Sequence, residues 1–574
     1  MTCERGRLSS SMMLQAGIRQ MLLSIGLSAC VLAVAAQESR PEADEHNTSS
    51  KNEPAVAFKE AEDYFRRGSF DQAIAKYNET LKSEPQSMAA YTGIVRCYLK
   101  QDRVRDAAQA LEKGLHAQPT DPGLKVAQGE LLFRQGKIHE SEEILVQLIN
   151  RGKAPARAYV DLAQIYSAIA MYVKERRFIL RAHDLDSTDQ DIQKAWTATL
   201  SRAERIKFLE SYLAQPTGDD ADTRRHLGEE LELLKARQSA PHGGCRLVSD
   251  ATATETDLLP LLQDPQHLRG LGLPVTINGQ KSKLLLDTGA GGITINRKLA
   301  ERAGVQRLAN LHIGGIGDKG EVQSYAAYAD SIRIGSLEFR NCPLQVFEKR
   351  SVVDEEGLIG ADVFQAFLIE IDFPNRKMKL SQLPARPGET QFKPSLATDD
   401  DEEASVAEAK PPASGTAGAP STSAPKYFDR FIAPEMNSYD RVYRFGHMLL
   451  VTTGINDVPG KLFLIDSGAW NNMITPDAAR EVTKVHGDSD TMIRGLSGAV
   501  KQVYETGTIV LNFGGLRQTN RDMVAFDLSN MSRDVGTEVS GTLGFAMLNL
   551  LKIKLDYRDA LVKFEYEPVP WRRY

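Results

Sequence analysis

The sequence is poor in cysteine and lacks a long hydrophobic run. Of five cysteines in 574 residues, only Cys97, Cys245 and Cys342 follow the first 36 residues, and they are widely spaced and odd in number. Such a set shows no disulfide framework. The apolar run at residues 21–35 is shorter than the roughly 20 residues that span a bilayer. With 42% hydrophobic and 25% charged residues, the chain is expected to form soluble globular domains, three or four of them at its length.

An excess of charge of one sign and metal-binding motifs are also lacking. Lys and Arg number 70 against 76 Asp and Glu, and the net charge of −6 argues against nucleic-acid binding. The ten histidines show no H-E-x-x-H motif and no paired Cys/His spacing, so we expect no metal and no other cofactor. A G-x-G-x-x-G pattern at residues 315–320 precedes a stretch that alternates like a strand, whereas a dinucleotide site needs a helix there. Nucleotide binding is therefore not expected.

The first 36 residues are typical of a secretory signal peptide. Three arginines precede the apolar run, and small residues at 33–36 offer a cleavage site. We therefore expect export, to the periplasm or the medium, of a chain that begins with a flexible segment at residues 37–55. Residues 27–30 also resemble a bacterial lipobox, in which a lipid on Cys30 would anchor the protein to a membrane. An uncleaved N-terminal anchor is the third alternative.

The next region repeats itself every 34 residues. Gly68, Asp102, Gly136 and Ala170 lie at this interval, and each is followed two positions later by a large apolar residue. The repeating residues resemble the tetratricopeptide repeats, which implies an all-α solenoid of antiparallel helix pairs. We assign residues 56–237 to this array, with its last helices capping the end.

A concave groove is typical of such an array and suggests recruitment of a protein partner or substrate. The plainer interpretation is that the repeating residues are only a packing core, and that the array is a spacer or a dimerisation element. A turn-rich stretch at residues 241–244 ends the region. It predicts that the repeats fold independently of the C-terminal part of the chain.

Two later segments share one plan. Residues 281–295 read KSKLLLDTGAGGITI, and residues 461–475 read KLFLIDSGAWNNMIT. In each, an apolar strand leads into an Asp-Thr-Gly or Asp-Ser-Gly triplet followed by Ala. A glycine-rich stretch typical of a β-hairpin tip comes next in both. Further on, Leu-Ile-Gly at residues 358–360 matches Thr-Leu-Gly at residues 542–544.

The paired motifs resemble the aspartic proteases, and the short halves are closer to the retropepsin-like, retroviral type than to a pepsin lobe. The resemblance implies two all-β domains, at residues 245–385 and 427–570, that form a pseudo-dimer. It implies that Asp287 and Asp466 are the catalytic pair. It also implies that the catalytic loops are built and held together by Thr288, Gly289, Ser467 and Gly468. The tips of two flaps over the substrate would be formed by Gly314, Gly315 and Gly317 in the first half and by Gly495 and Gly498 in the second.

Two facing carboxylates account for the chemistry of that family. Like charges at close range cannot both ionise, so the pair holds one proton. The ionised member deprotonates a water as it attacks the peptide carbonyl, and the protonated member donates to the developing oxyanion. The structural alternative is that both triplets are ordinary turns in which the Asp side chain accepts hydrogen bonds from backbone amides.

The joint between the halves, residues 386–426, has an acidic run followed by Pro, Ala, Gly, Ser and Thr. This composition predicts a flexible linker that is long enough for the halves to pair within one chain. The alternative is that each half dimerises with its counterpart in another chain. Asp287 would then face Asp287, and Asp466 would face Asp466.

The sequence thus predicts a multidomain protein, with a tetratricopeptide solenoid followed by two retropepsin-like domains, that acts as an exported aspartic endopeptidase on peptide or protein substrates. The rival function is a non-catalytic peptide-binding or scaffold protein that uses the tetratricopeptide groove. We expect Trp470 and Tyr325 to pack in a core rather than to line a pocket. We expect Asp372 and Asp556 to be structural or exposed.

Overall fold

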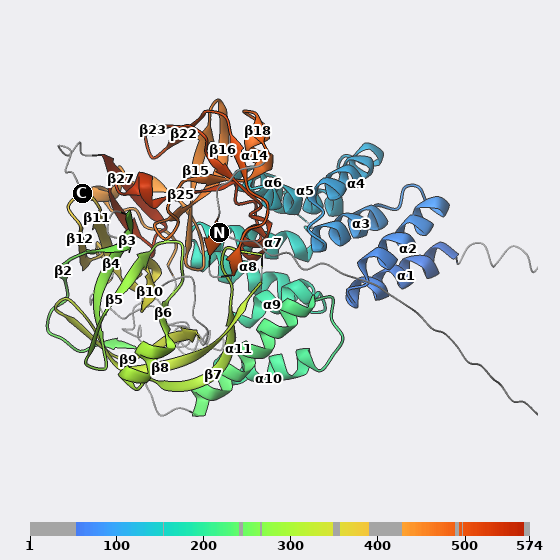
Figure 1. Ribbon diagram of the computed structural model, residues 1–574. Helices are drawn as coiled ribbons and strands as arrows, with labels where there is room; N and C mark the ends of the chain where they lie inside the picture. Colours follow the sequence, from blue (N-terminus) through green and yellow to red (C-terminus); the bar gives the residue numbers. More distant parts are fainter. Residues whose placement is uncertain are drawn as a thin grey trace, which may run out of the picture. The chain divides into compact units, whose positions relative to one another are not determined.

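The computed structural model describes residues 53–152, 154–239, 245–264, 267–318, 320–347, 356–387, 389, 428–487, 493–495 and 497–566. The predicted signal peptide, Cys30, the stretch at 241–244 and most of the predicted linker lie outside these residues. Helices make up the first part of the described chain and strands dominate the rest (Figure 1). No helix in the described ranges is both long and apolar enough to cross a membrane.

Four antiparallel helix pairs form the repeat region. The predicted 34-residue interval marks the turn inside each pair, where Gly68, Asp102, Gly136 and Ala170 adopt φ values of 74°, 59°, 75° and 56°. This left-handed backbone favours glycine, which explains its presence in two of the four units. The pairs are α1 (Glu53–Arg66) with α2 (Phe70–Ser83), α3 (Met88–Lys100) with α4 (Val104–Ala117), α5 (Pro122–Arg134) with α6 (Ile138–Asn150), and α7 (Ala156–Ala168) with α8 (Tyr172–Leu185).

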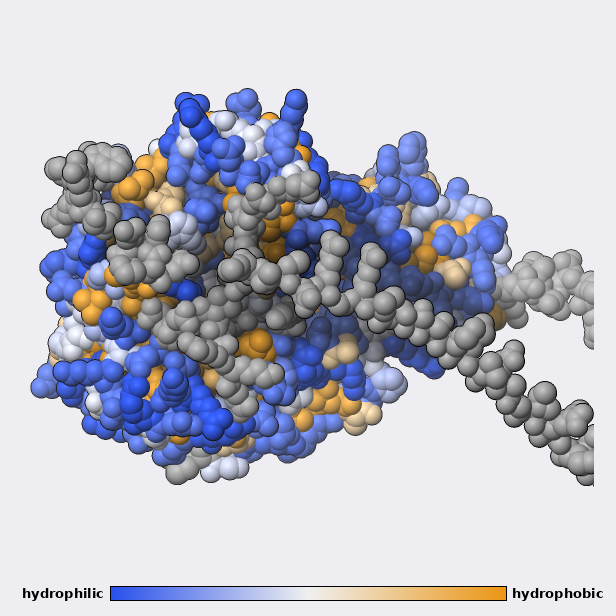
Figure 2. Space-filling view, viewed as in Figure 1, coloured by the Kyte–Doolittle hydropathy of each residue, from blue (hydrophilic) through white to orange (hydrophobic). Residues whose placement is uncertain are grey.

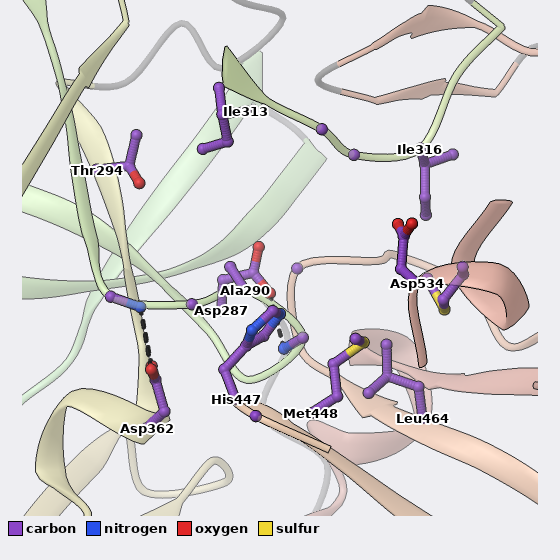
Figure 3. A pocket seen from close by; sticks show the side chains of 18 of the residues that line it. Asp287, Ala290, Thr294, Ile313, Ile316, Asp362, His447, Met448, Leu464 and Asp534 are labelled. Carbon is purple, nitrogen blue, oxygen red and sulfur yellow. Dashed lines mark hydrogen bonds between the residues drawn. The ribbon is translucent and has the colours of Figure 1, made fainter. Parts of the chain in front are cut away.

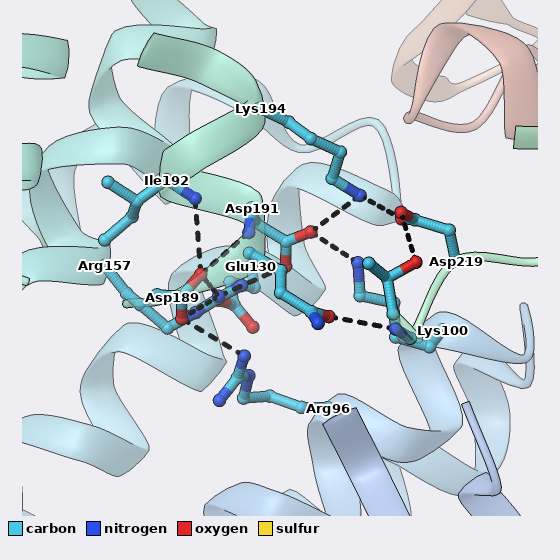
Figure 4. A network of polar contacts seen from close by, with 12 residues as sticks. Arg96, Lys100, Glu130, Arg157, Asp189, Asp191, Ile192, Lys194 and Asp219 are labelled. Carbon is cyan, nitrogen blue, oxygen red and sulfur yellow. Dashed lines mark hydrogen bonds and ion pairs between the residues drawn. The ribbon is translucent and has the colours of Figure 1, made fainter. Parts of the chain in front are cut away.

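Three further helices follow the pairs: α9 (Gln190–Thr197), α10 (Arg202–Leu213) and α11 (Ala221–Ser239). A charged network ties the start of α9 to earlier helices (Figure 4). Arg157 of α7 donates to Asp189 over 2.9 Å, and Lys100 of α3 donates to Asp191 over 2.6 Å. Because α3 and α7 are first helices of their pairs, α9 covers part of the face that these helices form. The predicted groove is therefore partly occupied by the chain itself.

The described residues of the first strand-rich half contain β1 to β12, one short α-helix and one 3-10 helix. Its nine-stranded sheet follows the order β1-β9-β6-β10-β5-β4-β8-β7, with β3 paired to β4. The bounds are β1 Arg246–Leu247, β2 Thr254–Asp257, β3 Leu259–Asp264, β4 His267–Ile277, β5 Gln280–Asp287, β6 Ile293–Asn296, α12 Arg297–Ala303, β7 Gln306–Ile313, β8 Val322–Ile334, β9 Leu337–Phe347, β10 Gly357–Gly360, η2 Ala361–Phe364, β11 Phe367–Asp372 and β12 Lys377–Gln382. The strand predicted after the G-x-G-x-x-G pattern is confirmed as β8.

The second half repeats this plan with shorter strands, in a ten-stranded sheet ordered β18-β21-β24-β17-β25-β16-β15-β22-β23, with β14 paired to β15. As β10 pairs parallel to β5, so β25 pairs parallel to β16. The bounds are β13 Asp440–Arg441, β14 Tyr443–Phe445, β15 Met448–Ile455, β16 Val458–Asp466, β17 Met473–Ile474, α14 Pro476–Arg480, β18 Val485–His486, β19 Arg494–Gly495, β20 Gly498–Ala499, β21 Tyr504–Thr506, β22 Ile509–Phe513, β23 Leu516–Asn520, β24 Val524–Ala525, α15 Ser529–Val535, β25 Gly541–Gly544, α16 Phe545–Leu548, β26 Leu551–Asp556 and β27 Leu561–Tyr566.

The terminal strands of the two halves meet in one shared sheet. Its order is β13-β27-β26-β11-β12-β2, and the central pair β11–β26 is antiparallel with Ile371 opposite Ile553. Both isoleucines are fully buried. The two halves of this single chain therefore contribute alternating hydrophobic residues to the same core.

A disulfide joins Cys245 to Cys342, a bridge that the number and spacing of the cysteines did not predict. The two cysteines are 97 residues apart in the sequence, and they come into contact only because β1 pairs with β9 next to them. Cys97 is a free and buried thiol in the repeats.

Removing the disulfide should destabilise the first half. Replacing Cys245 and Cys342 by alanine should lower the free energy of unfolding by about 2–4 kcal/mol, because the unfolded chain regains the freedom of a long closed loop. Urea unfolding followed by circular dichroism measures the change. As a control, dithiothreitol should lower the melting temperature of the natural protein and leave that of the double variant unchanged. Equal midpoints for both proteins under oxidising conditions would contradict the expectation.

The repeats and the strands share an apolar cluster, which argues against the prediction that the repeats fold independently of the C-terminal part of the chain. Phe133 at the end of α5 stacks edge to face on Phe445 with ring centroids 6.2 Å apart. The Thr537 hydroxyl donates to the Phe133 carbonyl, and the Glu538 amide donates to the Arg134 carbonyl over 3.1 Å. The largest buried members of the cluster from both sides are Phe133, Ile138, Leu145, Leu148, Leu162, Ile165, Tyr166, Leu450, Leu462 and Leu464.

The face of the molecule seen in Figure 2 is largely polar. Figure 2 shows a face that is mostly hydrophilic, with apolar residues in small separate patches. This distribution is ordinary for globular domains and agrees with the composition.

Candidate active site

The two triplets lie at the ends of matching strands. Asp287 ends β5 and Asp466 ends β16, and each strand is flanked by the strand that carries the predicted apolar pair and glycine. Gly360 pairs with Asp287 and Gly544 with Asp466 in the same register. The two matching segments thus lie directly beside the strands that end in the aspartates.

Hydrogen bonds cross between the loops in a nearly symmetrical set. The Thr288 hydroxyl donates to the Ile465 carbonyl over 2.8 Å and accepts from the Ser467 amide over 2.9 Å. The Ser467 hydroxyl in turn donates to the Leu286 carbonyl over 2.8 Å and accepts from the Thr288 amide over 3.0 Å. All four bonds are buried, so they fix the two strand ends against each other.

The glycines that end the triplets leave room for the opposite carboxylate. A Cβ at Gly289 would lie 2.7 Å from Cγ of Asp466, and one at Gly468 would overlap the Asp287 carboxylate. Each aspartate thus packs against the backbone of the other loop. Alanine at either position would push the carboxylates apart.

The two carboxyl groups share a buried environment. Burial first, and then the charge of Asp466, raises the pKa of Asp287, and burial also raises the pKa of Asp466. Backbone amides partly offset this effect: Gly289 N donates to Asp287 Oδ1, and Gly468 N and Ala469 N donate to Asp466 Oδ1, each over 3.0 Å. Two close carboxyls with raised pKa values retain one proton between them near neutral pH.

A cavity of about 2780 Å³ opens above the pair. Figure 3 shows Asp287 with Ala290, His447 and Met448 on its floor and Ile313 and Ile316 on the far side. Residues of α8 and α11, Tyr172 and Arg225 among them, complete the wall. Trp470 lines this cavity and is 45% exposed, so its predicted place in a core was wrong. Tyr325 packs against the core of the first half, as expected.

Two glycine-rich tips meet at the cavity. Gly314, Gly315 and Gly317 lie between β7 and β8, whereas Gly495 and Gly498 belong to the β19–β20 hairpin. The Gly315 amide donates to the Ser497 hydroxyl, and the Ser497 amide donates to the Ile316 carbonyl, each over 3.1 Å. The Ile316 side chain packs against an apolar cluster of the second half that includes Met473 and Phe526.

Asp362 and His447 contribute to the site and were missed in the sequence. Asp362 accepts a hydrogen bond from the Gly292 amide over 3.0 Å and so braces the Asp287 loop from behind (Figure 3). Burial raises the pKa of Asp362 to about 6. His447 lies in the turn between β14 and β15 with its ring against Gly291, and burial lowers the pKa of this ring, which favours the neutral form.

A local signal existed for only one of these two residues. Asp362 follows Gly360 at a fixed distance, so the apolar-pair motif could have been extended to include it. Nothing in the sequence around His447 distinguishes it.

The remaining predicted aspartates are structural. Asp372 caps the turn at Asn375, whose amide donates to it over 2.9 Å. Asp556 is fully buried and accepts from the Asp559 amide over 3.1 Å. Among the described residues, no group of three or more His, Cys, Asp and Glu side chains is arranged to hold a metal ion.

Comparison with known proteins assigns two parts of the chain. Residues 273–366 match the family "gag-polyprotein putative aspartyl protease", and residues 58–122 match "Tetratricopeptide repeat". The chain contains a retropepsin-like domain and tetratricopeptide repeats. The retropepsin-like match includes Asp287 and its supporting Leu-Ile-Gly segment.

Two curated relatives are fungal. DNA damage-inducible protein 1 of Neurospora crassa is 27% identical over 174 residues, which are 30% of this chain and 35% of the relative. The Chaetomium globosum protein of the same name is 32% identical over 110 residues, 19% of this chain and 24% of the relative. This chain thus spans about a third or less of either relative. A solved chain described as "Functional Characterization of Pseudomonas Aeruginosa pilF" covers 34% of this chain and 96% of its own length at 14% identity, with a TM-score of 0.24 that supports no argument.

Proposed function

We propose that the protein is an aspartic endopeptidase whose two strand-rich halves are both retropepsin-like and pair within one chain as a pseudo-dimer. The crossed hydrogen bonds between Thr288 and Ser467 carry this proposal, because they place Asp287 and Asp466 against each other. The parallel pairing of β10 and β25 to the two strands supports it. The shared sheet through β11 and β26 favours pairing within one chain over pairing between two chains.

In the proposed reaction one carboxyl is ionised and the other is protonated. The ionised group takes a proton from a water that attacks the peptide carbonyl, while the protonated group donates to the carbonyl oxygen. The carboxyl that took the water proton then gives it to the amide nitrogen as the C–N bond breaks, and the other carboxylate takes a proton back from a hydroxyl of the tetrahedral intermediate. The pair thus returns to its starting state with one proton. Asp362 holds the Asp287 loop in place but does not itself transfer the proton.

A peptide substrate would lie in the cavity between the pair and the two glycine-rich tips, which would act as flaps. The cavity volume suits an extended peptide of several residues better than a small molecule. Tetratricopeptide repeats are protein-interaction modules, and we propose that here they contact a partner or the substrate through surfaces that α9 leaves open. The rival scaffold function is disfavoured because both carboxylates remain and both are tuned by burial.

Export is part of the proposal. The N-terminal sequence predicts it, and the Cys245–Cys342 disulfide supports an oxidising compartment. Whether a signal peptidase or a lipid at Cys30 sets the mature N-terminus can be tested by mass spectrometry of the purified protein.

Digestion of casein by the purified full chain, with and without a statine-type peptide inhibitor, tests the activity. We expect cleavage that the inhibitor blocks and that a chelator leaves unchanged. Cleavage that resists the inhibitor and stops with a serine-protease reagent would contradict the proposed chemistry.

The rate should fall as the pH rises past the raised pKa of Asp287. Only the singly protonated pair is competent, and the shared proton is lost above that pKa. Because burial and Asp466 raise this pKa, the alkaline limb should lie well above the value of about 4 for an ordinary Asp. The dependence of kcat/KM on pH between 3 and 9 measures it. A rate that climbs steadily to pH 9 would count against the shared proton.

A further inference from the structure

Helix α11 of the repeat region contacts the edge of the first flap. β7 is the last strand of its sheet, so one side of it has no neighbouring strand in the sheet. Glu229 of α11 fills this position: one carboxylate oxygen accepts from the His312 amide over 3.0 Å, and the other lies 2.5 Å from Nδ1 of the same residue. A side chain of the repeats therefore pairs with backbone of the flap strand.

The other strand of the same hairpin is held as well. Glu321, which directly precedes β8, lies with one oxygen 2.5 Å from Nη2 of Arg225 and with the other 2.7 Å from Nε2 of His226. Arg225, His226 and Glu229 all belong to α11. Helix α11 thus contacts both strands of the first flap, close to the tip of the flap at Gly315 and Gly317.

Helix α11 is itself anchored to the repeats. Asp219, two residues before the helix, pairs with Lys194 over 2.5 Å and accepts from the Tyr212 hydroxyl over 2.7 Å. Lys194 also lies 3.3 Å from Asp191, which belongs to the network that reaches α3 and α7 (Figure 4). A chain of charged contacts therefore runs from the repeats to the flap.

We propose that α11 is a latch on the first flap, with Arg225, His226 and Glu229 as positioning residues that hold the flap closed over Asp287 and Asp466. The proposal rests on the proposed function in one respect only, since the latch controls access to the pair. Admission of a polypeptide would require the two tips, which are joined through Gly315, Ile316 and Ser497, to separate. A movement of the first flap would break its contacts with α11. The contacts of Arg225, His226 and Glu229 are partly exposed, and each alone contributes little stability. All three act on the same hairpin.

The latch differs from substrate recruitment in what it predicts. A recruitment surface changes the apparent affinity for large substrates, whereas a latch changes how often the flap opens. A protein that binds the repeats and shifts α11 would open the flap without itself entering the cavity.

Hydrogen exchange of the full-length protein, read by mass spectrometry over residues 306–330, tests the latch. Glu229→Ala and Glu321→Gln should each raise the exchange rate of this segment by about fivefold or more and leave β26 and β27 unchanged. Glu232→Ala, on an exposed side of α11, and Gln323→Ala, exposed on β8, are matched controls that should change nothing. Unchanged exchange in both latch variants, or an equal increase in the controls, would overturn the proposal.

Measuring kcat/KM for cleavage of a long peptide distinguishes a failure of the latch proposal from a failure of the proposed protease function. Both latch variants should raise kcat/KM for a long peptide and leave the shape of the pH profile as it is. Lower kcat/KM with faster exchange would mean that the contacts shape the closed flap for catalysis rather than restrain it, and would overturn the latch. If no protein in the series cleaves any peptide, the exchange result still decides on the latch, while the proposed function fails.

Discussion

Asp287→Asn and Asp466→Asn should each lower the rate of peptide cleavage by on the order of 10³-fold or more while the protein stays folded. One carboxylate cannot act as both the base that activates water and the acid that protonates the carbonyl oxygen. Asparagine has almost the same shape, so the crossed hydrogen bonds of Thr288 and Ser467 should survive. Initial rates on a cleaved peptide, with circular dichroism and melting temperature for each variant, measure the effect.

The control for this experiment is Asp372→Asn, which removes an aspartate that only caps a turn. It should keep nearly full activity. Mixing the two inactive variants should restore nothing, because each chain builds its site from its own two halves. Recovered activity in the mixture would show that the halves pair between chains, and normal activity in either single variant would show that the pair is not the catalytic unit.

Deleting the repeats, so that the chain begins at Cys245, should abolish cleavage of short and long substrates alike. The deletion exposes Leu450, Leu462 and Leu464, which are buried against the repeats, at about 1.5–3 kcal/mol for each side chain. It also removes the partners of Thr537 and Glu538. The melting temperature and the elution volume of the truncated protein, with its rate on a short peptide, give the result.

A pair of single substitutions separates loss of the interface from loss of repeat stability. Phe133→Ala removes a ring that meets Phe445 across the interface, whereas Phe65→Ala removes a buried ring that packs within the core of the first repeats. Each should cost about 3–5 kcal/mol. Only Phe133→Ala should also reduce cleavage of a short peptide at a temperature where both proteins are folded. Full short-peptide activity in the truncated protein would contradict the shared core.

Periodicity made the repeats predictable. Gly68 and Gly136 mark turns that need left-handed backbone, and this requirement recurs wherever a helix pair is repeated. The catalytic loops were predictable for a similar reason. An aspartate, a hydroxyl residue and a glycine each have a separate task there, so the triplet recurs with little variation in both halves.

Contacts between distant segments were not predictable. The interface at Phe133 uses backbone carbonyls and ordinary leucines, which look the same in any core. Cys245 and Cys342 meet only because β1 pairs with β9. Trp470 resembles a core residue by type, and only the position of its loop exposes it to the cavity. The grip of α11 on the flap depends on charges, such as Glu229, that are common on any helix surface.

Titration of the active site with a tight inhibitor shows whether one chain builds one complete site. A peptide that the protein cleaves is resynthesised with a hydroxyethylene group in place of the scissile bond, and its binding is followed by calorimetry. We expect one inhibitor bound per chain, complete loss of cleavage at that ratio, and much weaker binding to Asp287→Asn and Asp466→Asn. One inhibitor per two chains, or cleavage that persists at saturation, would contradict a single site built from Asp287 and Asp466 of the same chain.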